Sequence, residues 1–366
     1  MHIRIKRQII PFLLVLMTLL TACGAPQETP GEQPPEQDSQ AETELPEEPE
    51  QPDFVPEGNV NPLTGLCDGI SDQAMSRRPV AVMVSNSYDS LPQWGISQAD
   101  IIYEMLAEGR ITRLLAIFKD PSKIDKLASV RSSRPYFIDI AQSYGAVYMH
   151  FGGSVPAYEA IAARKDLISM DGIRGGWEGK LYFRDPDRRK QLGLEHSVYT
   201  TGEYIEEALG SLKADLSQEI QPSAFTFTDG GPTENGTAME KVTITFSNRH
   251  KPYYTYNAEN GTYLRFQYDK PHMDAWQNKQ IEVKNLFVLR MKTTDLNNDL
   301  HLVDVKTTGS GEGYYFCGGR YIPITWKKDA YNTPITFYDA SGTPLSVARG
   351  NTFISVVTET ADVVIE

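Results

Sequence analysis

Residues 78–86 read RPVAVMVSN, a compact apolar run that ends in turn-forming residues. A run of this length and composition is typical of a strand that is buried in a sheet. Strand-like runs follow at 100–106 (DIIYEML) and 112–118 (TRLLAIF), with a Glu108-Gly109 turn between them. We therefore expect the first folded part of the chain to be built on a central β-sheet.

Two helical patterns follow these strands. Residues 134–144 (RPYFIDIAQSY) and 156–164 predict helices, and the strand-like run AVYMHF at 146–151 lies between them. Strands that alternate with helices predict a layered arrangement in which helices pack on a sheet. We interpret 59–218 as an α/β or α+β N-terminal domain with a central sheet and flanking helices.

The pattern changes near residue 219. Runs of alternating apolar and polar residues follow, such as VTITF at 242–246. Tyrosine-rich runs at 253–256 and 263–268 flank a turn that contains the Asn-Gly pair of a β-hairpin. Because this part of the sequence has no long segment with helical periodicity, we predict a mostly antiparallel β-rich C-terminal domain over 219–366.

The first 22 residues predict a signal peptide. Three basic residues precede an apolar run at 9–20, which is shorter than the roughly 20 residues of a membrane-spanning helix. The run ends in LTACG at 20–24, which resembles the bacterial lipobox. In a lipobox the cysteine thiol receives a diacylglyceryl group before the signal peptide is removed, so we expect Cys23 to be lipidated. The alternatives are a plain secretory signal with an incidental cysteine and a short anchor helix.

A lipidated cysteine determines where the protein is held. Acyl chains such as palmitate contribute about 0.8 kcal/mol per buried CH₂ group, and two of them form a stable anchor. We therefore expect a lipoprotein of the cell envelope on the extracytoplasmic face of the bacterial cell membrane. Residues 23–58 follow the anchor and hold eleven acidic residues and eight prolines, with no Lys or Arg. This composition predicts a disordered, extended tether.

Charge and hydropathy exclude two classes of protein. The chain has a formal net charge of −13, and much of it comes from the acidic tether. No basic excess remains to neutralise nucleic-acid phosphates, so we expect no nucleic-acid partner. The one long apolar segment lies at the N-terminus, which excludes a polytopic membrane protein.

The sequence offers little catalytic context. Once Cys23 is acylated, Cys67 and Cys317 remain, and they could form a disulfide whose geometry the sequence leaves open. There is no CxxC pair, Gly-x-Ser-x-Gly elbow, His-Glu-x-x-His motif or phosphate-binding loop. The sequence therefore identifies no catalytic residue, leaves enzymatic activity open and favours its absence.

Arginines gather at the ends of the predicted elements of the N-terminal domain. Arginine is the side chain best suited to bidentate binding of phosphate or carboxylate groups. For a single arginine the alternative is a surface salt bridge, but the clustering favours a shared anion site. Carboxylates among arginines could hold Mg²⁺ beside a pyrophosphate, and Asp100 and Asp185 are the candidate ligands. The candidate pyrophosphate-binding residues are Arg110, Arg113, Arg131, Arg134, Arg184, Arg188 and Arg189.

The histidines and the aromatic clusters each have two interpretations. His150 ends a strand-like run, which favours a hydrogen-bonded core residue over a ligand. His196 could act as a general base near neutral pH, but without an identified partner we favour a structural role. The tyrosine-rich clusters at 253–256 and 314–316 could bind a sugar or a peptide. We favour cross-strand packing within a sheet for both clusters.

Several segments together resemble the YerB-like family of bacterial lipoproteins. The resemblance covers nearly all of 59–360 and implies an N-terminal and a C-terminal domain of unknown function, without an assigned reaction. The matching segments are NPLTGL at 61–66, RPVAVMV at 78–84, GISQADIIYEMLAEGRITRLLAIF at 95–118, SVRSSRP at 129–135, YMHFGG at 148–153, the segment 183–200 and GGRYIPITWKK at 318–328.

The N-terminal domain is also similar, more loosely, to the catalytic domains of the LytR-CpsA-Psr family. That resemblance implies transfer of wall polymers from polyprenyl pyrophosphate carriers. It places Asp100 at the family's acidic position, Arg131 at its first arginine position and Arg184, with Arg188 or Arg189, in its arginine-rich segment. The family has an aspartate after the first arginine, where this chain has Ser132. The resemblance therefore implies pyrophosphate binding more than transfer.

Two functions follow from the sequence. The first is a non-catalytic binding or scaffold lipoprotein that acts on cell-envelope proteins or wall polymers. The second is LytR-CpsA-Psr-like binding or transfer of a polyprenyl-pyrophosphate-linked wall precursor, which would use the arginine cluster and Mg²⁺ and would make the protein a phosphotransferase. We favour the first because the sequence has an anchor and a tether but no complete catalytic motif.

Overall fold

The computed structural model describes residues 57–217, 225–229 and 231–366. The predicted signal peptide, Cys23, almost the whole tether and the domain boundary predicted at 218 and 219 lie outside the described residues. No helix of the described residues is long and apolar enough to span a membrane.

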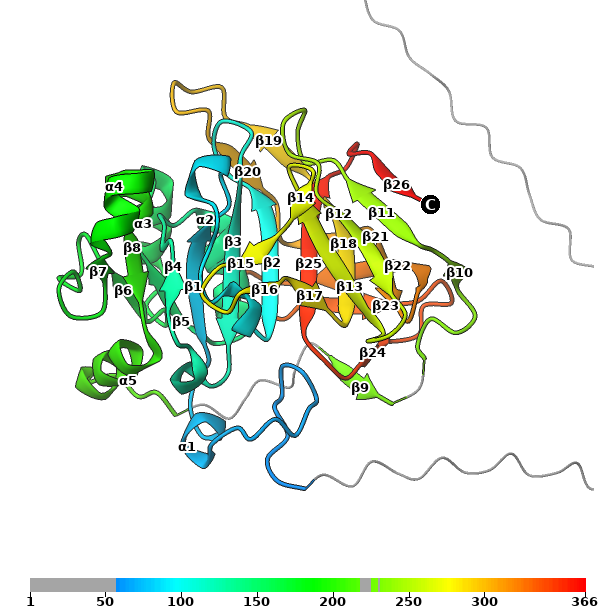
Figure 1. The fold of residues 1–366 in the computed structure, drawn as a ribbon, viewed down its shortest axis with the longest axis horizontal. Helices are drawn as coiled ribbons and strands as arrows, with labels where there is room; N and C mark the ends of the chain where they lie inside the picture. The colour runs from blue at the N-terminus through cyan, green and yellow to red at the C-terminus, as the bar shows by residue number, and fades with distance from the viewer. Residues whose placement is uncertain (1–56, 218–224, 230) are drawn as a thin grey trace, which may run out of the picture. The chain divides into compact units, whose positions relative to one another are not determined.

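An eleven-stranded sheet forms the centre of the molecule, and both predicted domains contribute strands to it (Figure 1). The strand order is β10-β22-β21-β18-β25-β2-β3-β1-β5-β6, and β23 pairs with β22. The strands that precede residue 218 are β1 (Val80–Ser85), β2 (Ile101–Leu106), β3 (Thr112–Phe118), β5 (Val147–His150) and β6 (Ser169–Asp171). The later strands are β10 (Thr237–Ala238), β18 (Asn285–Met291), β21 (Gly309–Cys317), β22 (Arg320–Lys328), β23 (Thr336–Tyr338) and β25 (Thr352–Thr358).

Strand β25 joins the two parts of this sheet. It lies between β2 and β18 and runs parallel to both, with Phe353 opposite Ile102 on one side and Leu286 on the other. Its sequence TFISVVT is rich in β-branched and aromatic residues, and only its last residue is not buried. This composition is typical of a parallel strand that is covered on both faces.

Successive side chains along each strand point to opposite faces of the central sheet, and a hydrophobic core lies on each face. In β1, Val82 and Val84 belong to one core, whereas Ala81 and Met83 belong to the other, as the side-chain period of two requires. The core that contains Ala81 also includes apolar residues from two helices. These helices are α2 (Pro135–Ser143) and α3 (Val155–Ala163).

A six-stranded antiparallel sheet contributes to the core that contains Val82. Its order is β14-β13-β12-β11-β26, and β17 pairs with β13. Strands β12 and β13 are antiparallel with Asn257 opposite Thr262, which confirms the hairpin predicted from the Asn-Gly turn. The strands are β11 (Lys241–Ile244), β12 (Tyr253–Asn257), β13 (Thr262–Gln267), β14 (Lys270–Pro271), β17 (Glu282–Val283) and β26 (Val363–Ile365).

The remaining elements are short. The helices are α1 (Asp72–Met75), α4 (Pro186–Leu192) and α5 (Gly202–Ser211), and the 3₁₀ helices are η1 (Tyr88–Ser90), η2 (Ile96–Gln98), η3 (Pro121–Lys123) and η4 (Leu194–His196). The short strands are β4 (Leu127–Ala128), β7 (Phe183–Arg184), β8 (Val198–Thr200), β9 (Thr226–Thr228), β15 (Met273–Asp274), β16 (Lys279–Gln280), β19 (Thr293–Asp295), β20 (Val303–Val305) and β24 (Ser346–Ala348).

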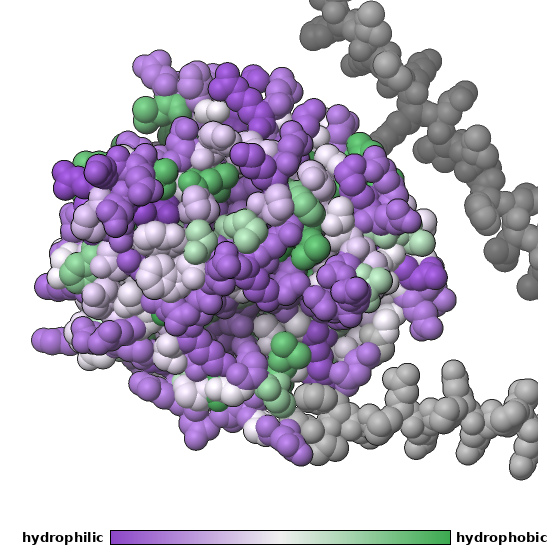
Figure 2. Space-filling view, viewed as in Figure 1, coloured by the Kyte–Doolittle hydropathy of each residue, from purple (hydrophilic) through white to green (hydrophobic). Residues whose placement is uncertain are grey.

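The predicted fold class is confirmed. The first part of the chain has a mixed sheet with flanking helices, and the second part is mostly antiparallel β-structure. The structure adds that one sheet runs through both parts. Figure 2 shows that one face of the molecule is mostly hydrophilic, with apolar side chains scattered over it.

Candidate functional site

Two of the predicted arginines pair with one carboxylate, and a third lies close to one of them. Glu108 is ion-paired with both Arg113 and Arg134, and its Oε2 lies 2.6 Å from Arg134 Nη2. Burial of Arg113 and the nearby positive charges of Arg134 and Arg131 lower the pKa of Arg113 to about 10. The structure thus brings these three arginines together, and Arg113 and Arg134 share Glu108 as their acidic partner.

Three predicted arginines hold one short turn. The successive carbonyl oxygens of η4 accept hydrogen bonds from Arg184 (2.8 Å), Arg131 (3.0 Å) and Arg188 (3.1 Å). Arg131 also pairs with Glu195 at 3.1 Å, and Arg184 pairs with Glu178 at 2.9 Å. These guanidinium groups therefore stabilise the backbone of the η4 turn.

Arg188 and the two remaining candidate arginines differ in their exposure. Arg188 is buried and donates to the carbonyl oxygens of Ser90 (3.0 Å) and Pro92 (2.8 Å). Arg110 and Arg189 are exposed, the first on the turn between β2 and β3 and the second on α4. Pyrophosphate binding by these seven arginines stays a prediction.

The two predicted metal ligands have different partners. Asp100 accepts hydrogen bonds from Asn61 Nδ2 (2.9 Å) and from the backbone nitrogen of Lys119 (2.6 Å), and desolvation raises its pKa to about 7. Asp185 caps α4 and pairs with Lys126 at 3.0 Å. Within the described ranges, no group of three His, Cys, Asp or Glu side chains could hold a metal ion. Mg²⁺ binding by Asp100 and Asp185 beside a pyrophosphate stays a prediction.

The two histidines have different environments. His150 is buried, and its ring nitrogens contact the Gly152 carbonyl oxygen (2.7 Å) and Ser169 Oγ (2.8 Å), as a hydrogen-bonded core residue does. His196 is half-buried, and its desolvation and the charge of Arg131 lower its pKa. A lowered pKa keeps the His196 ring neutral at neutral pH.

The cysteines do not form the disulfide that the sequence left open, since both Cys67 and Cys317 are free. The Cys317 side chain is buried in a hydrophobic core, whereas Cys67 lies on a partly exposed segment.

The tyrosine clusters pack within the sheets. Tyr253 stacks on Phe266 of the neighbouring strand, with ring centroids 4.7 Å apart, and Tyr315 is fully buried.

A cleft of about 680 Å³ lies where segments from both parts of the chain meet. We call it the hairpin cleft, because the turn between β13 and β14 forms one of its walls. The loop after β1 and the end of α4 form the others. Its volume is within the range of small-ligand sites. Its polar and aromatic lining includes Tyr88, Asp89, Gln191, Tyr268, Lys270 and His272.

Two tyrosines line this cleft. The Tyr88 side chain is 61% exposed, and its ring lies edge-on to the Tyr268 ring with centroids 5.1 Å apart. Tyr268 and Asp269 form the two-residue turn between β13 and β14, and both have positive φ angles, 53° and 57°. Such turns require this backbone, which is unfavourable for a large aromatic residue and is concentrated at functional sites. The turn therefore fixes an aromatic ring in the wall of the cleft.

A buried carboxylate on β2 is the centre of a polar network between the two sheets. Glu104 Oε1 accepts hydrogen bonds from three side chains and Oε2 from one. The donors are Asn86 Nδ2 (2.7 Å), Thr112 Oγ1 (2.7 Å), His250 Nε2 (2.6 Å) and Arg265 Nη2 (2.8 Å). Burial alone would raise the pKa of Glu104, but Arg265 and His250 lower it to about 2. The carboxylate is therefore ionised, and Arg265 is its buried counter-ion.

The network reaches the hairpin cleft through His272 and Gln267. Arg265 donates to His272 Nδ1, and His272 Nε2 donates to Gln93 Oε1 at 2.7 Å. Burial and the charge of Arg265 lower the pKa of His272, so its ring is neutral. Gln267 Oε1 accepts from Arg265 at 2.8 Å, whereas its buried Nε2 has no partner among the described residues. His272 and Gln267 thus connect the buried network to the lining of the cleft.

This arrangement suits binding better than catalysis. Glu104 is fully buried and its oxygens are occupied by four donors, so it is poorly placed to move a proton at the cleft. His272 uses both ring nitrogens within the network. The groups that remain available at the cleft are aromatic rings and hydrogen-bonding side chains.

The sequence did not identify this site, although it contains a signal for it. Arg265 and Gln267 are buried in β13, whereas Leu264 and Phe266 on the opposite face are half-buried. A strand with one covered face normally buries its apolar set, whereas β13 turns Arg265 and Gln267 inward together with Tyr263. The usable signal is a pair of charged residues within apolar strand patterns, Arg265 in one and Glu104 in the other.

Both parts of the chain match profiles of known protein domains. A profile described as "Protein of unknown function (DUF3048) N-terminal domain" matches residues 63–215, and the corresponding C-terminal profile matches 242–354. "Putative lipoprotein YerB" of Bacillus subtilis (strain 168) is 29% identical over 302 residues, which cover 81% of this chain and 85% of that protein. The crystal structure of the YerB protein from Bacillus subtilis has a TM-score of 0.72 and 27% identity, and the match covers 84% of this chain and 100% of that one.

Proposed function

Because the chain belongs to the DUF3048 family, whose two domains are described as of unknown function, we propose a function from the geometry of its own residues. We propose that it is a lipid-anchored binding protein on the extracytoplasmic face of the bacterial cell membrane. In this proposal the hairpin cleft binds a glycan segment of a wall polymer, and the protein catalyses no reaction. The similarity to a protein named as a lipoprotein supports the anchor, which we assign to Cys23.

The observation that carries the glycan proposal is the pair of tyrosines at a cleft that also has polar side chains in its lining. Tyr88 and Tyr268 present two rings at 84° to each other, and rings of this kind provide a large apolar contact area at little entropic cost. The C–H faces of a sugar ring can pack on them. Asp89, Gln191 and Lys270 line the same cleft and supply acceptors and donors for hydroxyl groups.

The buried network supports binding by keeping the cleft in shape. Arg265, on β13 of the second sheet, connects Glu104 of the central sheet to Gln267 of the same strand and to His272, which follows β14. A site whose side chains are fixed by a surrounding hydrogen-bond network loses less entropy when it binds a ligand. The network thus fixes the shape of the cleft before a ligand binds.

Co-sedimentation with purified, protein-free cell-wall sacculi tests this proposal. The full-length protein in detergent should pellet with sacculi, and a Tyr88→Ala/Tyr268→Ala variant should bind at least about tenfold more weakly, since aromatic anchors dominate such contacts. Tyr253→Ala is the matched control, because Tyr253 stacks on Phe266 and does not line the cleft. The proposal fails if the wild-type protein stays in the supernatant or if the double variant and the control bind equally well.

The anchor has a separate test. Cys23→Ser should abolish incorporation of radiolabelled palmitate, and it should prevent the acylation and cleavage that produce the mature lipoprotein. Electrophoresis should therefore show an unprocessed, unlabelled chain. Equal labelling of the variant and the wild-type protein would overturn the assignment of Cys23.

The polyprenyl-pyrophosphate alternative is distinguished by a thermal-shift measurement. A short polyprenyl pyrophosphate at 100 times its Kd stabilises a binding protein by about 2.7 kcal/mol. A shift that requires Mg²⁺ and is lost in Arg131→Ala/Arg184→Ala would favour this alternative. We expect no such shift, because Arg131 and Arg184 already donate to the η4 carbonyls and to acidic side chains.

A further inference from the structure

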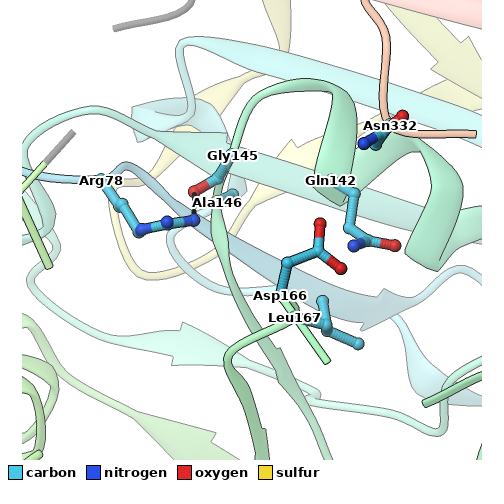
Figure 3. A pocket seen from close by; sticks show the side chains of 7 residues that line it. All are labelled: Arg78, Gln142, Gly145, Ala146, Asp166, Leu167 and Asn332. Atoms are coloured by element: carbon cyan, nitrogen blue, oxygen red, sulfur yellow. Dashed lines mark hydrogen bonds between the residues drawn. The ribbon is translucent and has the colours of Figure 1, made fainter. Parts of the chain in front are cut away.

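A second pocket, of about 200 Å³, lies beside the end of α2 (Figure 3). Segments that are far apart in the sequence supply its polar groups. Arg78 precedes β1, Gln142 is in the last turn of α2, Asp166 follows α3 and Asn332 is on the loop after β22. Because the pocket is small and these groups differ in charge, it suits a small polar molecule and not a polymer.

The amide of Gln142 is the unexplained group in this pocket. The residue is only 7% exposed, and neither its Oε1 nor its Nε2 has a hydrogen-bond partner among the described residues. A buried polar group without a partner costs about 1–3 kcal/mol. Such groups are rare in native proteins, and a bound molecule is one reason why they persist. Figure 3 shows the side chains of Gln142 and Asp166 directed toward each other.

The charged groups around this amide have opposite signs. Arg78 donates from Nη1 to the Gly145 carbonyl oxygen at 3.0 Å, and its buried Nε has no partner among the described residues. Figure 3 shows the Arg78 guanidinium at the Gly145–Ala146 turn and Asp166 on the side of Gln142. The pocket therefore offers a cationic donor, an anionic acceptor and an amide that can both donate and accept.

We propose that this pocket binds a free small amino acid as a zwitterion. The ligand's carboxylate is held by Arg78, and its ammonium group is held by Asp166 and by Gln142 Oε1. Gln142 Nε2 donates to the ligand carboxylate, so one ligand satisfies both atoms of the buried amide. This binding site goes beyond the proposed function, because it shares no residue with the hairpin cleft.

The loop that carries Asn332 is fixed on α2 before any ligand binds. Lys328 is buried, and its ammonium group donates to Ser143 Oγ (2.7 Å) and to the carbonyl oxygens of Tyr331 (2.7 Å) and Ala330 (2.8 Å). These contacts join the loop after β22 to the last residue of α2, next to Gln142. A pre-formed wall lowers the entropic cost of binding a small ligand.

Isothermal titration calorimetry of the full-length protein in detergent tests this proposal with alanine as the probe. Acetate and ethylamine each carry one of the two charged groups, and each should bind at least about tenfold more weakly than alanine. Gln142→Met keeps the size of the side chain and removes both amide atoms, and it should weaken alanine binding by at least about tenfold. Asp166→Asn should do the same, whereas Asp299→Asn, on an exposed loop outside the pocket, should not.

Thermal unfolding of each variant separates loss of binding from loss of folding. Gln142→Met should unfold at the wild-type temperature or above it, because it removes a buried amide without partners. The proposal is overturned if neither alanine nor glycine binds, or if acetate binds as tightly as alanine. It is also overturned if Gln142→Met retains alanine binding, since the amide then serves only to hold water.

Discussion

Replacing Glu104 by glutamine should destabilise the protein strongly, because it leaves Arg265 as a buried charge without a counter-ion. Both side chains are fully buried, and Glu104 Oε2 lies 2.8 Å from Arg265 Nη2. Glutamine has nearly the same shape as glutamate, so the change creates no large cavity. It removes the charge and places an amide NH₂ group among four hydrogen-bond donors. The loss of stability therefore reports on electrostatics and hydrogen bonding, and not on packing.

The ion pair itself and the lowered pKa that it produces indicate the size of the effect. Removal of one partner from a buried ion pair costs about 3–5 kcal/mol. The pKa of Glu104 lies at about 2 instead of 4.5. A difference of this size corresponds to roughly 3 kcal/mol, at about 1.4 kcal/mol per pKa unit. We therefore expect Glu104→Gln to lower the free energy of unfolding by about 3–5 kcal/mol, where a surface substitution changes it by at most about 0.5 kcal/mol.

Urea unfolding at pH 7 measures this effect through the transition midpoint. Arg265→Met is the reciprocal variant, and the Glu104→Gln/Arg265→Met double variant closes the cycle. Because neither buried charge remains in the double variant, its cost should be smaller than the sum of the two single costs by at least about 1 kcal/mol. Glu259→Gln, on the exposed turn of the β12–β13 hairpin, is the control. A cost below about 1 kcal/mol for Glu104→Gln, or strict additivity in the cycle, would refute the argument.

Three further predictions concern pH and backbone geometry. The folded-state pKa of Glu104 is about 2, below its ordinary 4.5. The stability that its carboxylate contributes is therefore complete above pH 4.5 and is lost as the pH falls toward 2. Acid unfolding followed by circular dichroism should show a smaller loss of stability with falling pH in Glu104→Gln than in the wild-type protein. The pKa of Asp100 is raised from 3.8 to about 7. The stability that its protonated carboxyl group contributes is therefore complete below pH 3.8 and is lost as the pH rises through 7. Asp100→Asn should reduce the fall in melting temperature between pH 5 and pH 9. Gly95→Ala should cost at least about 2 kcal/mol, because φ is +71° and the new Cβ would lie 2.4 Å from the Lys126 carbonyl oxygen. Gly109→Ala, which has φ +56° and open space around it, should cost about 1 kcal/mol in the same urea assay.

The fold was largely predictable because it depends on short-range patterns. The apolar run at 78–86 predicts a buried strand, and β1 (Val80–Ser85) lies within it. The Asn-Gly turn likewise predicts the hairpin of β12 and β13. The continuous sheet was not predictable in this way. The position of β25 between β2 and β18 depends on pairing between residues such as Phe353 and Ile102, and no local pattern encodes that partner.

The site was much less predictable than the fold. Arginine type and spacing identified Arg131, Arg184 and Arg188, but not the η4 carbonyl oxygens that they contact. Backbone acceptors carry no sequence signature, so an arginine that holds a loop cannot be told from an arginine that binds a phosphate. The partners Glu104 and Arg265 are separated by 161 positions. Their pairing becomes visible only when the two sheets are stacked.

The position of β25 has a consequence for biosynthesis. The ribosome makes this strand after every other strand of the largest sheet, yet it occupies the middle of that sheet. Until it is made, β2 and β18 each expose an unpaired edge, and such edges are prone to associate with other chains. A nascent chain that stops near residue 350 therefore lacks the strand that joins the two parts of the central sheet, even if each part has already collapsed. The sheet therefore cannot close before β25 has been made, and a premature stop codon ahead of residue 352 is expected to be damaging although it leaves the other ten strands of the sheet intact.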